Sequence, residues 1–272
     1  MTNEHKPNST YRGRIAPTPS GYLHAGHLRT FRIAWERARQ AGGTLFYRND
    51  DLDPRRSRPE YLQAAMEDLR AHGLDWDEGP DLGGPYDPYH QSARAGNYLK
   101  AWRKLREAGL IYPCRRSRKE IREASRLSAD GEEYLFPYEF RLAESTLPFQ
   151  EFDEADEPGE VNWRFRTPDD REVRVEDLGF GPKTFHTGKD FGDFLVWRKD
   201  GVAAYELATV ADDIDMGVTE VVRGADLLKS SARQCLLFEV LGKPRPVFYH
   251  CELVLGPDGR KLSKSERSLA SS

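Results

Sequence analysis

The chain has 272 residues, of which 38% are hydrophobic and 32% are charged, and its formal net charge is −4 at pH 7. This length allows one large domain or two modest ones, and the composition is typical of a soluble globular protein. No apolar run approaches the roughly 20 residues that span a bilayer, and the polar N-terminus lacks a signal-peptide core, so we expect a cytoplasmic protein with no membrane partner. Because the net charge is negative, any nucleic-acid partner must meet a local basic surface.

Alternating strands and helices are predicted in the first part of the chain. Residues 12–17 and 44–48 are typical of short strands, and the apolar residues between them recur at helical spacing. Pro59 can open a second helix, and Ser92 can cap a third. This order predicts a parallel sheet with crossover helices. The apolar faces of the three helices comprise Phe31, Ala34, Trp35 and Ala38, then Leu62, Met66 and Leu69, then Tyr98, Trp102 and Leu105.

The alternation fails in the middle of the chain, where we expect an inserted subdomain. Apolar strands return at residues 193–198 and 219–224, and a helix with Ser231 as its cap is predicted at residues 231–241, so the sheet resumes there. The predicted organisation has three parts. They are residues 1–110 and 193–272 as the two halves of one α/β domain, and residues 111–192 as the insertion.

Two stretches of opposite charge lie within the insertion. Residues 115–126, RRSRKEIREASR, hold six basic and two acidic residues, and residues 150–160 hold six acidic residues and no basic one. The basic stretch can contact RNA phosphates, or it can be a solvated helix face. If it contacts RNA, removing its charges should weaken RNA binding without affecting chemistry elsewhere.

Two histidines lie three residues apart in the stretch SGYLHAGHLRT, between the first strand and the first helix. By itself an H-x-x-H pair matches a metal site, a helix cap or chance. Its position, however, is the carboxyl end of the predicted sheet, where a helix N-terminus offers N–H groups and a positive dipole end to an anion. Gly26 has no side chain, so a base or a phosphate can approach closely. The sequence therefore indicates a phosphate site at His24 and His27, and zinc is disfavoured because no third ligand is near.

A second stretch, KLSKS near the C-terminus, carries two lysines on a serine-rich loop. Lys261 and Lys264 can hold a polyphosphate and follow its charge into the transition state. Alone, such a loop is better explained as a solvated tail. Together with the histidine pair at the other end of the chain, it indicates a nucleotide site.

HAGH and KLSKS resemble the two ATP-binding motifs of the class I aminoacyl-tRNA synthetases. The resemblance narrows to the glutamyl branch, and within it to the short glutamyl-queuosine tRNA(Asp) synthetases, on the segments RIAPTPSGYLHAGH, GLDWDEGPDLGGPYDPYHQSAR, YPCRRSRKEI and GVTEVVRGADLLKSSARQ. It covers about residues 12–265 and is weak only at about residues 127–190. It implies a Rossmann-type parallel sheet with helices on both faces and an inserted α+β subdomain that resembles an acceptor-binding one. The short tail after KLSKS fits the short form, but it is shorter than this family leads us to expect, so a truncated chain stays open.

The resemblance implies a glutamate pocket. Arg14 is expected to grip the side-chain carboxylate of glutamate, because a planar guanidinium makes two parallel bonds to a carboxylate. The family more often has serine where Thr18 stands. Tyr205 and Arg223 match further pocket positions, and the alternatives are a tyrosine packed on the sheet and a surface arginine. The glutamate-binding residues are expected to be Arg14, Ala16, Thr18, Asp50, Tyr205 and Arg223.

One pocket position departs from the family. In FYRNDDLDPRRS the chain has Asp50 where the family has a glutamate that binds the α-amino group of the substrate. The charge is kept, but the side chain is one methylene shorter, so the backbone shifts, a water bridges the gap or the amino-acid preference differs. A plain acidic turn is the alternative. We expect Asp50 to keep the amine-binding role.

A zinc site that is common in the family is not expected here. The family carries Cys-x-Cys followed by a tyrosine and another cysteine, whereas this chain has Cys114 but Arg116 at the second position. No cysteine lies between residues 115 and 234, so the four ligands of a structural zinc cannot be assembled from that motif. We expect Arg116 to pair with an acidic neighbour such as Glu139 in place of the metal, or the insertion to pack around apolar residues.

The resemblance implies a two-step ligase reaction. ATP, assisted by Mg²⁺, activates L-glutamate to glutamyl-adenylate, with His24, His27 and Lys264 stabilising phosphate charge and with Gly26 and Lys261 in the ATP site. The glutamyl group is then transferred to the queuosine base in the anticodon of tRNA(Asp). We expect the enzyme to be a monomer.

Three other functions stay open. A truncated or divergent glutamyl-tRNA synthetase would charge the 3′ end of tRNA(Glu), and in full length it would carry a helical anticodon-binding region. A small-molecule adenylyltransferase shares the histidine phosphate site but needs neither the glutamate pocket nor KLSKS. A noncatalytic binder of tRNA or nucleotide would not need intact HAGH and KLSKS, although the departure at Asp50 is compatible with it.

Overall fold

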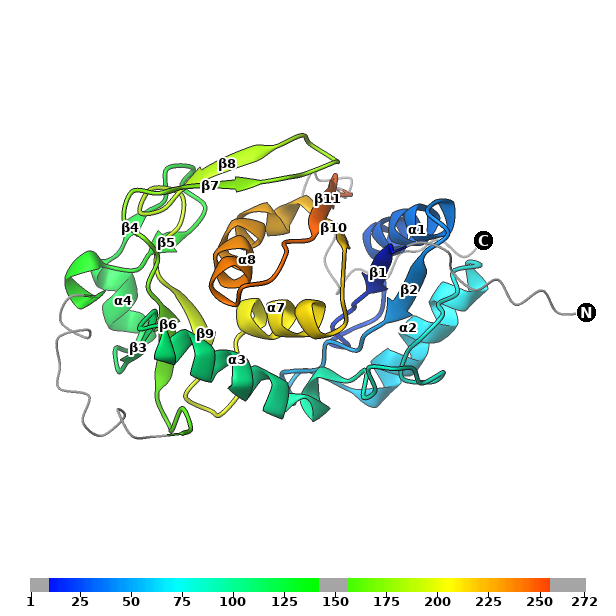
Figure 1. Ribbon diagram of the computed structural model, residues 1–272, viewed down its shortest axis with the longest axis horizontal. Helices are drawn as coiled ribbons and strands as arrows, with labels where there is room; N and C mark the ends of the chain where they lie inside the picture. Colours follow the sequence, from blue (N-terminus) through cyan, green and yellow to red (C-terminus); the bar gives the residue numbers. More distant parts are fainter. Residues whose placement is uncertain (1–9, 142–155, 255–272) are drawn as a thin grey trace, which may run out of the picture.

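The computed structural model describes residues 10–141 and 156–254. Two pairs of parallel strands form the centre of the protein, as the predicted order of strands and helices requires (Figure 1). The pairs lie side by side, and the Thr219 N–H donates to the Arg12 carbonyl oxygen at 3.0 Å. The first pair is β1 (Arg12–Ile15) with β2 (Thr44–Tyr47), and the second is β10 (Glu220–Gly224) with β11 (Val247–Cys251).

Helices pack against these strands from both sides (Figure 1). They are α1 (Ala25–Gln40), α2 (Pro59–Ala71), α3 (Ala95–Glu107), α7 (Tyr205–Asp215) and α8 (Leu228–Val240), with 3-10 turns η1 (Gln91–Ala93) and η2 (Ala225–Leu227). The predicted face of α1 is buried at Phe31, Ala34 and Ala38, and Pro59 opens α2 as expected. Within the described ranges, no helix combines the length and the apolar composition needed to cross a membrane.

Two predicted helix caps are wrong. Ser92 lies in η1, and its N–H and hydroxyl both donate to the Asp51 carboxylate at 2.8 Å, so it ties two loops together instead of opening α3. Ser231 lies inside α8, where its buried Oγ accepts a hydrogen bond from Arg223 at 2.6 Å. In both cases a tertiary partner uses the hydroxyl that local sequence assigned to a helix N-terminus.

The insertion is built mainly from antiparallel strands, to the left of the central strands in Figure 1. Its elements are β3 (Ile111–Cys114), α4 (Arg118–Ala124), β4 (Arg126–Leu127), β5 (Tyr134–Leu135), β6 (Asn162–Phe165), β7 (Glu172–Val175), β8 (Lys183–His186) and β9 (Phe194–Trp197). The strand predicted at residues 193–198 forms as β9, but it joins β3 and β6 and not the parallel strands. The division into three parts at residues 110 and 192 stays a prediction.

One apolar core joins the insertion to the central strands. Trp102 of α3 meets Trp163 of β6 edge to face, with ring centroids 4.9 Å apart. The same cluster of buried side chains continues to Leu207 of α7 and Phe248 of β11. Burial of this apolar surface fixes the insertion against the central strands and their helices, so polar side chains of both parts can be held at fixed positions relative to each other.

Candidate active site

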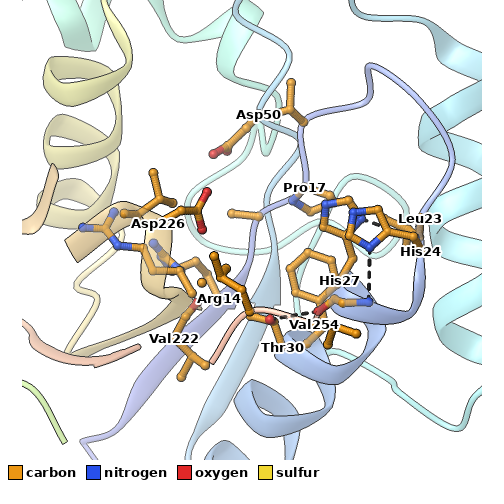
Figure 2. Close-up of a pocket in the computed structure, with 18 of the residues that line it drawn as sticks. Arg14, Pro17, Leu23, His24, His27, Thr30, Asp50, Val222, Asp226 and Val254 are labelled. Carbon is orange, nitrogen blue, oxygen red and sulfur yellow. Dashed lines mark hydrogen bonds between the residues drawn. The ribbon is translucent and has the colours of Figure 1, made fainter. Parts of the chain in front are cut away.

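A cavity of about 380 Å³ lies at the carboxyl ends of β1, β2 and β10. Its walls come from the loop between β1 and α1, the end of β2, the first residue of α7, η2 and residues 252–254. Figure 2 shows the imidazoles of His24 and His27 on the opposite side of the cavity from Asp226. Open α/β proteins bind ligands at this edge of a parallel sheet, so the cavity is the candidate active site.

The cavity collects the site residues that the sequence predicts within the described ranges. Lys261 and Lys264 of KLSKS lie outside the described residues. The structure thus brings together side chains from residues 14–50 and residues 205–254, while the role of each residue stays a prediction. The predicted residues that line the cavity are Arg14, Ala16, Thr18, His24, Gly26, His27, Asp50, Tyr205 and Arg223.

The two histidines of HAGH form the N-terminal cap of α1. His24 Nδ1 accepts from the Gly26 N–H at 3.1 Å, and the His24 N–H donates to His27 Nδ1 at 3.3 Å. The two rings stack with their centroids 3.7 Å apart and their planes 24° apart. The helix cap and the phosphate site are therefore compatible uses of the same pair, since capping occupies one nitrogen of each ring.

This cap determines which ring nitrogen carries the proton. Because each Nδ1 accepts a hydrogen bond, we assign the proton of the neutral imidazole to Nε2 in both His24 and His27. The Nε2–H groups can then donate to a phosphate oxygen near the positive end of the α1 dipole. A Cβ at Gly26 would lie 3.1 Å from both Cε1 and Nδ1 of His24, so a larger residue there would displace the ring.

Four buried side chains of alternating charge connect the two ends of the predicted glutamate pocket. Arg14 Nε lies 3.4 Å from Asp213 Oδ1, and Arg48 Nη1 donates to the same oxygen at 2.7 Å. Arg48 also donates to both oxygens of Asp50, from Nε at 2.6 Å and from Nη2 at 3.3 Å. Each buried charge has a partner, as burial requires, and the chain fixes Arg14 and Asp50 relative to each other.

Asp50 has a perturbed acidity in this position. Burial raises the pKa of its carboxyl to about 6, although the adjacent Arg48 guanidinium favours the ionised form. Asp50 is therefore ionised at pH 7 and titrates just below it. An ionised carboxylate that lines the cavity can hold an ammonium group, whereas the protonated acid cannot.

Arg223 is held at the carboxyl end of β10 by side chains from two helices. Its Nη1 donates to the Tyr205 hydroxyl at 3.3 Å and its Nη2 to Ser231 Oγ at 2.6 Å, while the guanidinium carbon lies 5.2 Å from the Phe248 ring centroid. Arg223 is only 5% exposed, and Tyr205 is the first residue of α7. The alternative of a surface arginine is therefore wrong.

Sequence reasoning missed Arg48 and Asp213. Arg48 is fully buried beside Asp50 in the stretch FYRNDD, so a charged residue at the end of an apolar strand was the available signal. Asp213 lies in α7, which is not among the predicted helices, although Leu207, Val210 and Ile214 recur there at helical spacing. Neither residue lines the cavity, but both fix side chains that do.

The surroundings of Cys114 show what lies where the family commonly carries zinc. Cys114 is buried, and no group of three or more histidine, cysteine, aspartate or glutamate side chains in the described ranges is arranged to hold a metal ion. Arg116 pairs with Glu120 at 3.4 Å, and its guanidinium carbon lies 4.5 Å from the Phe140 ring centroid. Glu120 is thus an acidic partner of Arg116 in the structure, while a pairing with Glu139 and the loss of the zinc site stay predictions.

A larger cavity of about 1500 Å³ lies between the loop after β2 and the face of the insertion that carries α4. Its lining has eight arginine or lysine and four aspartate or glutamate side chains, in a chain whose net charge is −4. We call it the basic groove. It is the kind of local basic surface that a negatively charged protein needs to bind nucleic acid. Its basic residues are Arg55, Arg56, Arg115, Arg116, Arg118, Arg164, Arg198 and Lys199.

The comparisons with known proteins agree on one family. The family described as tRNA synthetases class I (E and Q), catalytic domain, matches residues 10–272. A glutamyl-Q tRNA(Asp) synthetase from Symbiobacterium thermophilum is 46% identical over 262 residues, which cover 93% of this chain and 77% of that protein. A glutamate–tRNA ligase from the same organism is 39% identical over 261 residues, which cover 96% of this chain and 54% of the ligase.

A solved structure confirms the predicted fold class. The crystal structure of a glutamate-tRNA synthetase from Elizabethkingia anophelis matches with a TM-score of 0.82 at 32% identity. The match covers 94% of this chain and 52% of that one, so the chain spans about half the length of the solved synthetase. The α/β fold with parallel strands, crossover helices and an insertion is the Rossmann-type fold of class I synthetases.

Proposed function

Because the chain belongs to the class I tRNA synthetase family of the E and Q catalytic domain, we propose that it activates L-glutamate with ATP and transfers the glutamyl group to queuosine in the anticodon of tRNA(Asp). As a family member, the chain is a ligase of the aminoacyl-tRNA synthetase type. The choice of queuosine is supported by the similarity to a relative named glutamyl-Q tRNA(Asp) synthetase, 77% of which the chain covers.

The observation that supports glutamate as the substrate is the match between its charges and those of the cavity wall. Glutamate has two carboxylates and one ammonium group, and the cavity wall presents two arginines, Arg14 and Arg223, together with Asp50. Both guanidinium groups are 5% exposed, and burial strengthens their attraction for a carboxylate. Arg14 would grip the side-chain carboxylate and Asp50 the ammonium, with Ala16, Thr18 and Tyr205 completing the wall.

In the first step, the α-carboxylate of glutamate attacks the α-phosphorus of ATP, and pyrophosphate leaves. The reaction depends on positioning and on stabilising charge more than on proton transfer. The Nε2–H groups of His24 and His27 would donate to phosphate oxygens as charge shifts to the pyrophosphate, and Gly26 would admit the nucleotide. Lys261 and Lys264 would hold the phosphates from the KLSKS loop.

ATP brings Mg²⁺ to such a site. A magnesium ion usually keeps phosphate oxygens and one or two carboxylates as ligands. Asp226, across the cavity from the histidine pair, and Glu252 are cavity-lining carboxylates that would hold the ion. When bound, the ion would neutralise phosphate charge.

In the second step, a hydroxyl of the queuosine ring attacks the carbonyl carbon of the adenylate, an ester forms and AMP leaves. The basic groove supports an RNA partner, because its arginines can neutralise RNA phosphates. Water must be kept from the adenylate, because it would hydrolyse it.

Charging of the 3′ end of tRNA(Glu) is the second candidate function. The similarity to a glutamate–tRNA ligase at 39% identity favours it, although the chain covers only 54% of that ligase. Both functions use the same adenylate and the same pocket, so they differ only in the RNA acceptor.

The test is ATP–pyrophosphate exchange with a panel of amino acids, first without tRNA. We expect exchange with glutamate alone, followed by transfer of glutamate to tRNA(Asp) that contains queuosine and not to tRNA(Asp) that lacks it. Exchange that appears only with tRNA(Glu), and glutamate recovered on its 3′ end, would favour the second function. The absence of exchange with every amino acid, with or without tRNA, would contradict both.

Glutamate binding is expected to weaken as the pH falls through about 6. The pKa of Asp50 is raised to about 6, so its carboxylate becomes protonated in this range and loses its attraction for the ammonium of glutamate. The KM for glutamate should be flat above about pH 7 and rise towards a limit of about tenfold per pH unit below about pH 6. The measurement is the exchange rate against glutamate concentration from pH 5 to 8.

Two comparisons isolate Asp50 in this experiment. The Asp50→Asn variant should have a raised KM for glutamate that no longer depends on pH in this range. The KM for ATP in the wild-type protein should not follow the same curve. A pH profile that is identical in the wild type and the variant would exclude Asp50 as the titrating group.

Charge removal across the basic groove is expected to weaken tRNA binding and to leave amino-acid activation unchanged. Arg56 and Arg118 are exposed and line the groove from the loop after β2 and from α4. In the double variant Arg56→Gln, Arg118→Gln, the loss of two phosphate contacts should lower the slope of log Kd against log salt concentration by about 1 to 2. The measurements are tRNA titrations at several salt concentrations and tRNA-independent exchange.

A matched control removes two charges elsewhere. Lys100 and Lys104 are exposed on α3 and do not line the basic groove. The double variant Lys100→Gln, Lys104→Gln should retain the wild-type salt dependence. If both double variants weaken tRNA binding equally, the effect is one of net charge and the groove is not the binding surface.

A further inference from the structure

A buried contact connects the insertion to Arg223. Asp177 follows β7 of the insertion, and it forms a parallel bridge with Phe248 of β11. A Cβ at Gly179 would lie 2.1 Å from the His250 carbonyl oxygen, so the turn after Asp177 is pressed against the backbone of β11. Asp177 is 3% exposed and His250 is 1% exposed, and neither lines the catalytic cavity.

Asp177 accepts hydrogen bonds on both carboxylate oxygens. Oδ1 accepts from the N–H groups of Gly179 at 2.9 Å and Phe180 at 2.7 Å. Oδ2 accepts from the His250 backbone N–H at 3.1 Å and contacts His250 Nδ1. An ionised carboxylate, which only accepts, satisfies all these donors, whereas an asparagine would direct its NH₂ against a backbone N–H on either side.

The carboxylate determines the proton position on His250. Nδ1 lies against Asp177 and therefore carries the proton, so the neutral ring presents Nε2 as an acceptor. Burial, aided by the charge of Arg223, lowers the pKa of the imidazole to about 4, which keeps the ring neutral at pH 7. Nε2 then accepts from Arg223 Nε at 3.3 Å, and it also lies 2.9 Å from Ser231 Oγ.

We propose that Asp177 and His250 are positioning residues that hold the Arg223 guanidinium toward the catalytic cavity, and that the insertion thereby sets the affinity for glutamate. The role in glutamate affinity rests on the proposed function of Arg223. The carboxylate fixes the imidazole tautomer, and the acceptor nitrogen fixes the Nε edge of the guanidinium, while Tyr205 and Ser231 fix its two terminal nitrogens. A preorganised guanidinium loses less freedom when it binds a carboxylate.

The first test is kinetic and uses the full chain. Asp177→Asn should raise the KM for glutamate about tenfold, because one hydrogen bond to a charged group is lost or reoriented, with the KM for ATP unchanged within about twofold. His250→Gln can keep an acceptor oxygen near Arg223, and its KM for glutamate should rise less than that of Asp177→Asn. The measurement is ATP–pyrophosphate exchange against each substrate, with melting curves to verify that each variant is folded.

Asp193→Asn is the matched control. Asp193 is another buried aspartate, 8% exposed, directly before β9, and it accepts from the Thr167 N–H at 2.9 Å and from the Tyr112 hydroxyl at 2.6 Å, both of them in the insertion. Its replacement should leave the KM for glutamate unchanged. An equal rise of this KM in Asp177→Asn and Asp193→Asn would overturn the proposal, because it would show a general effect of destabilising the insertion.

The second test does not depend on the proposed function. In the protein with ¹⁵N-labelled histidine, which has seven histidines, the signals missing in His250→Gln identify His250. We expect the Nδ1–H tautomer in the wild type, with Nε2 unprotonated. An Nε2–H tautomer in the wild type would overturn the proposal even if no variant folds. If wild-type exchange with glutamate is absent, the proposed function fails, while the tautomer still decides whether Arg223 is held in this way.

Discussion

Replacing Arg14 by lysine is expected to raise the KM for glutamate about 100-fold and to leave the KM for ATP within about twofold of the wild type. Lysine keeps the positive charge that Asp213 requires as a buried partner, so the ion pairs of the pocket are not left unbalanced. What lysine lacks is the planar fork that makes two parallel bonds to a carboxylate. The measurement is ATP–pyrophosphate exchange at varied glutamate concentration and saturating ATP.

A second arginine of the same strand provides the control for Arg14. Arg12 does not line the cavity, and it makes two hydrogen bonds to Glu78, at 3.0 and 2.8 Å. Arg12→Lys also replaces a paired, largely buried guanidinium, so it should change thermal stability slightly without changing the KM for glutamate. If Arg14→Lys binds glutamate as tightly as the wild type, Arg14 does not bind the substrate carboxylate.

Replacing His24 by asparagine is expected to lower kcat for adenylate formation about 100- to 1000-fold with little change in stability. His24 is proposed to have two separable tasks: Nδ1 caps α1 by accepting from the Gly26 N–H, and Nε2 is the proposed donor to a phosphate oxygen. Asparagine is among the best N-cap residues, so it keeps the first task and removes the second. The measurements are the exchange rate at saturating substrates and the melting temperature.

His24→Ala separates the two tasks further. Alanine removes both the cap and the Nε2 donor, so it should reduce kcat as much as asparagine does and also destabilise the protein by about 1 kcal/mol. The role of His24 in charge stabilisation would be contradicted by near-normal kcat in His24→Asn. In that outcome, the histidine serves only to begin the helix.

Local sequence determined the strands and helices that flank the nucleotide site. The apolar runs at β1, β2 and β10 and the helical spacing of Phe31, Ala34 and Ala38 are each visible within a short window. Because the carboxyl ends of parallel strands meet at one edge, residues predicted to follow these strands had to lie close together. Arg14, Asp50 and Arg223 line one cavity for this reason.

Predictions from short stretches of sequence fail where the partner of a residue is distant in the chain. The helix α7 has Leu207, Val210 and Ile214 at helical spacing, but it is buried at every position from Glu206 to Asp213. Short stretches of sequence do not show which distant arginines pair with its buried carboxylates. The strand β9 is apolar as predicted, but an apolar run does not say which strand it pairs with, and it pairs with β6. Ser92 and Ser231 have the residue type of caps, yet their hydroxyls bond Asp51 and Arg223.

The sequence by itself determined which charged and nitrogen-bearing groups the candidate site holds, because HAGH, Arg14, Asp50 and Arg223 are each visible in a short stretch. Only the tertiary structure decided how those groups are oriented. Arg48 and Asp213 fix Arg14 and Asp50, and the insertion reaches Arg223 through a buried histidine. Apart from Arg48, which is two residues from Asp50, these partners come from distant segments, since burying a charge requires an opposite charge or a hydrogen bond that the folded chain brings to it.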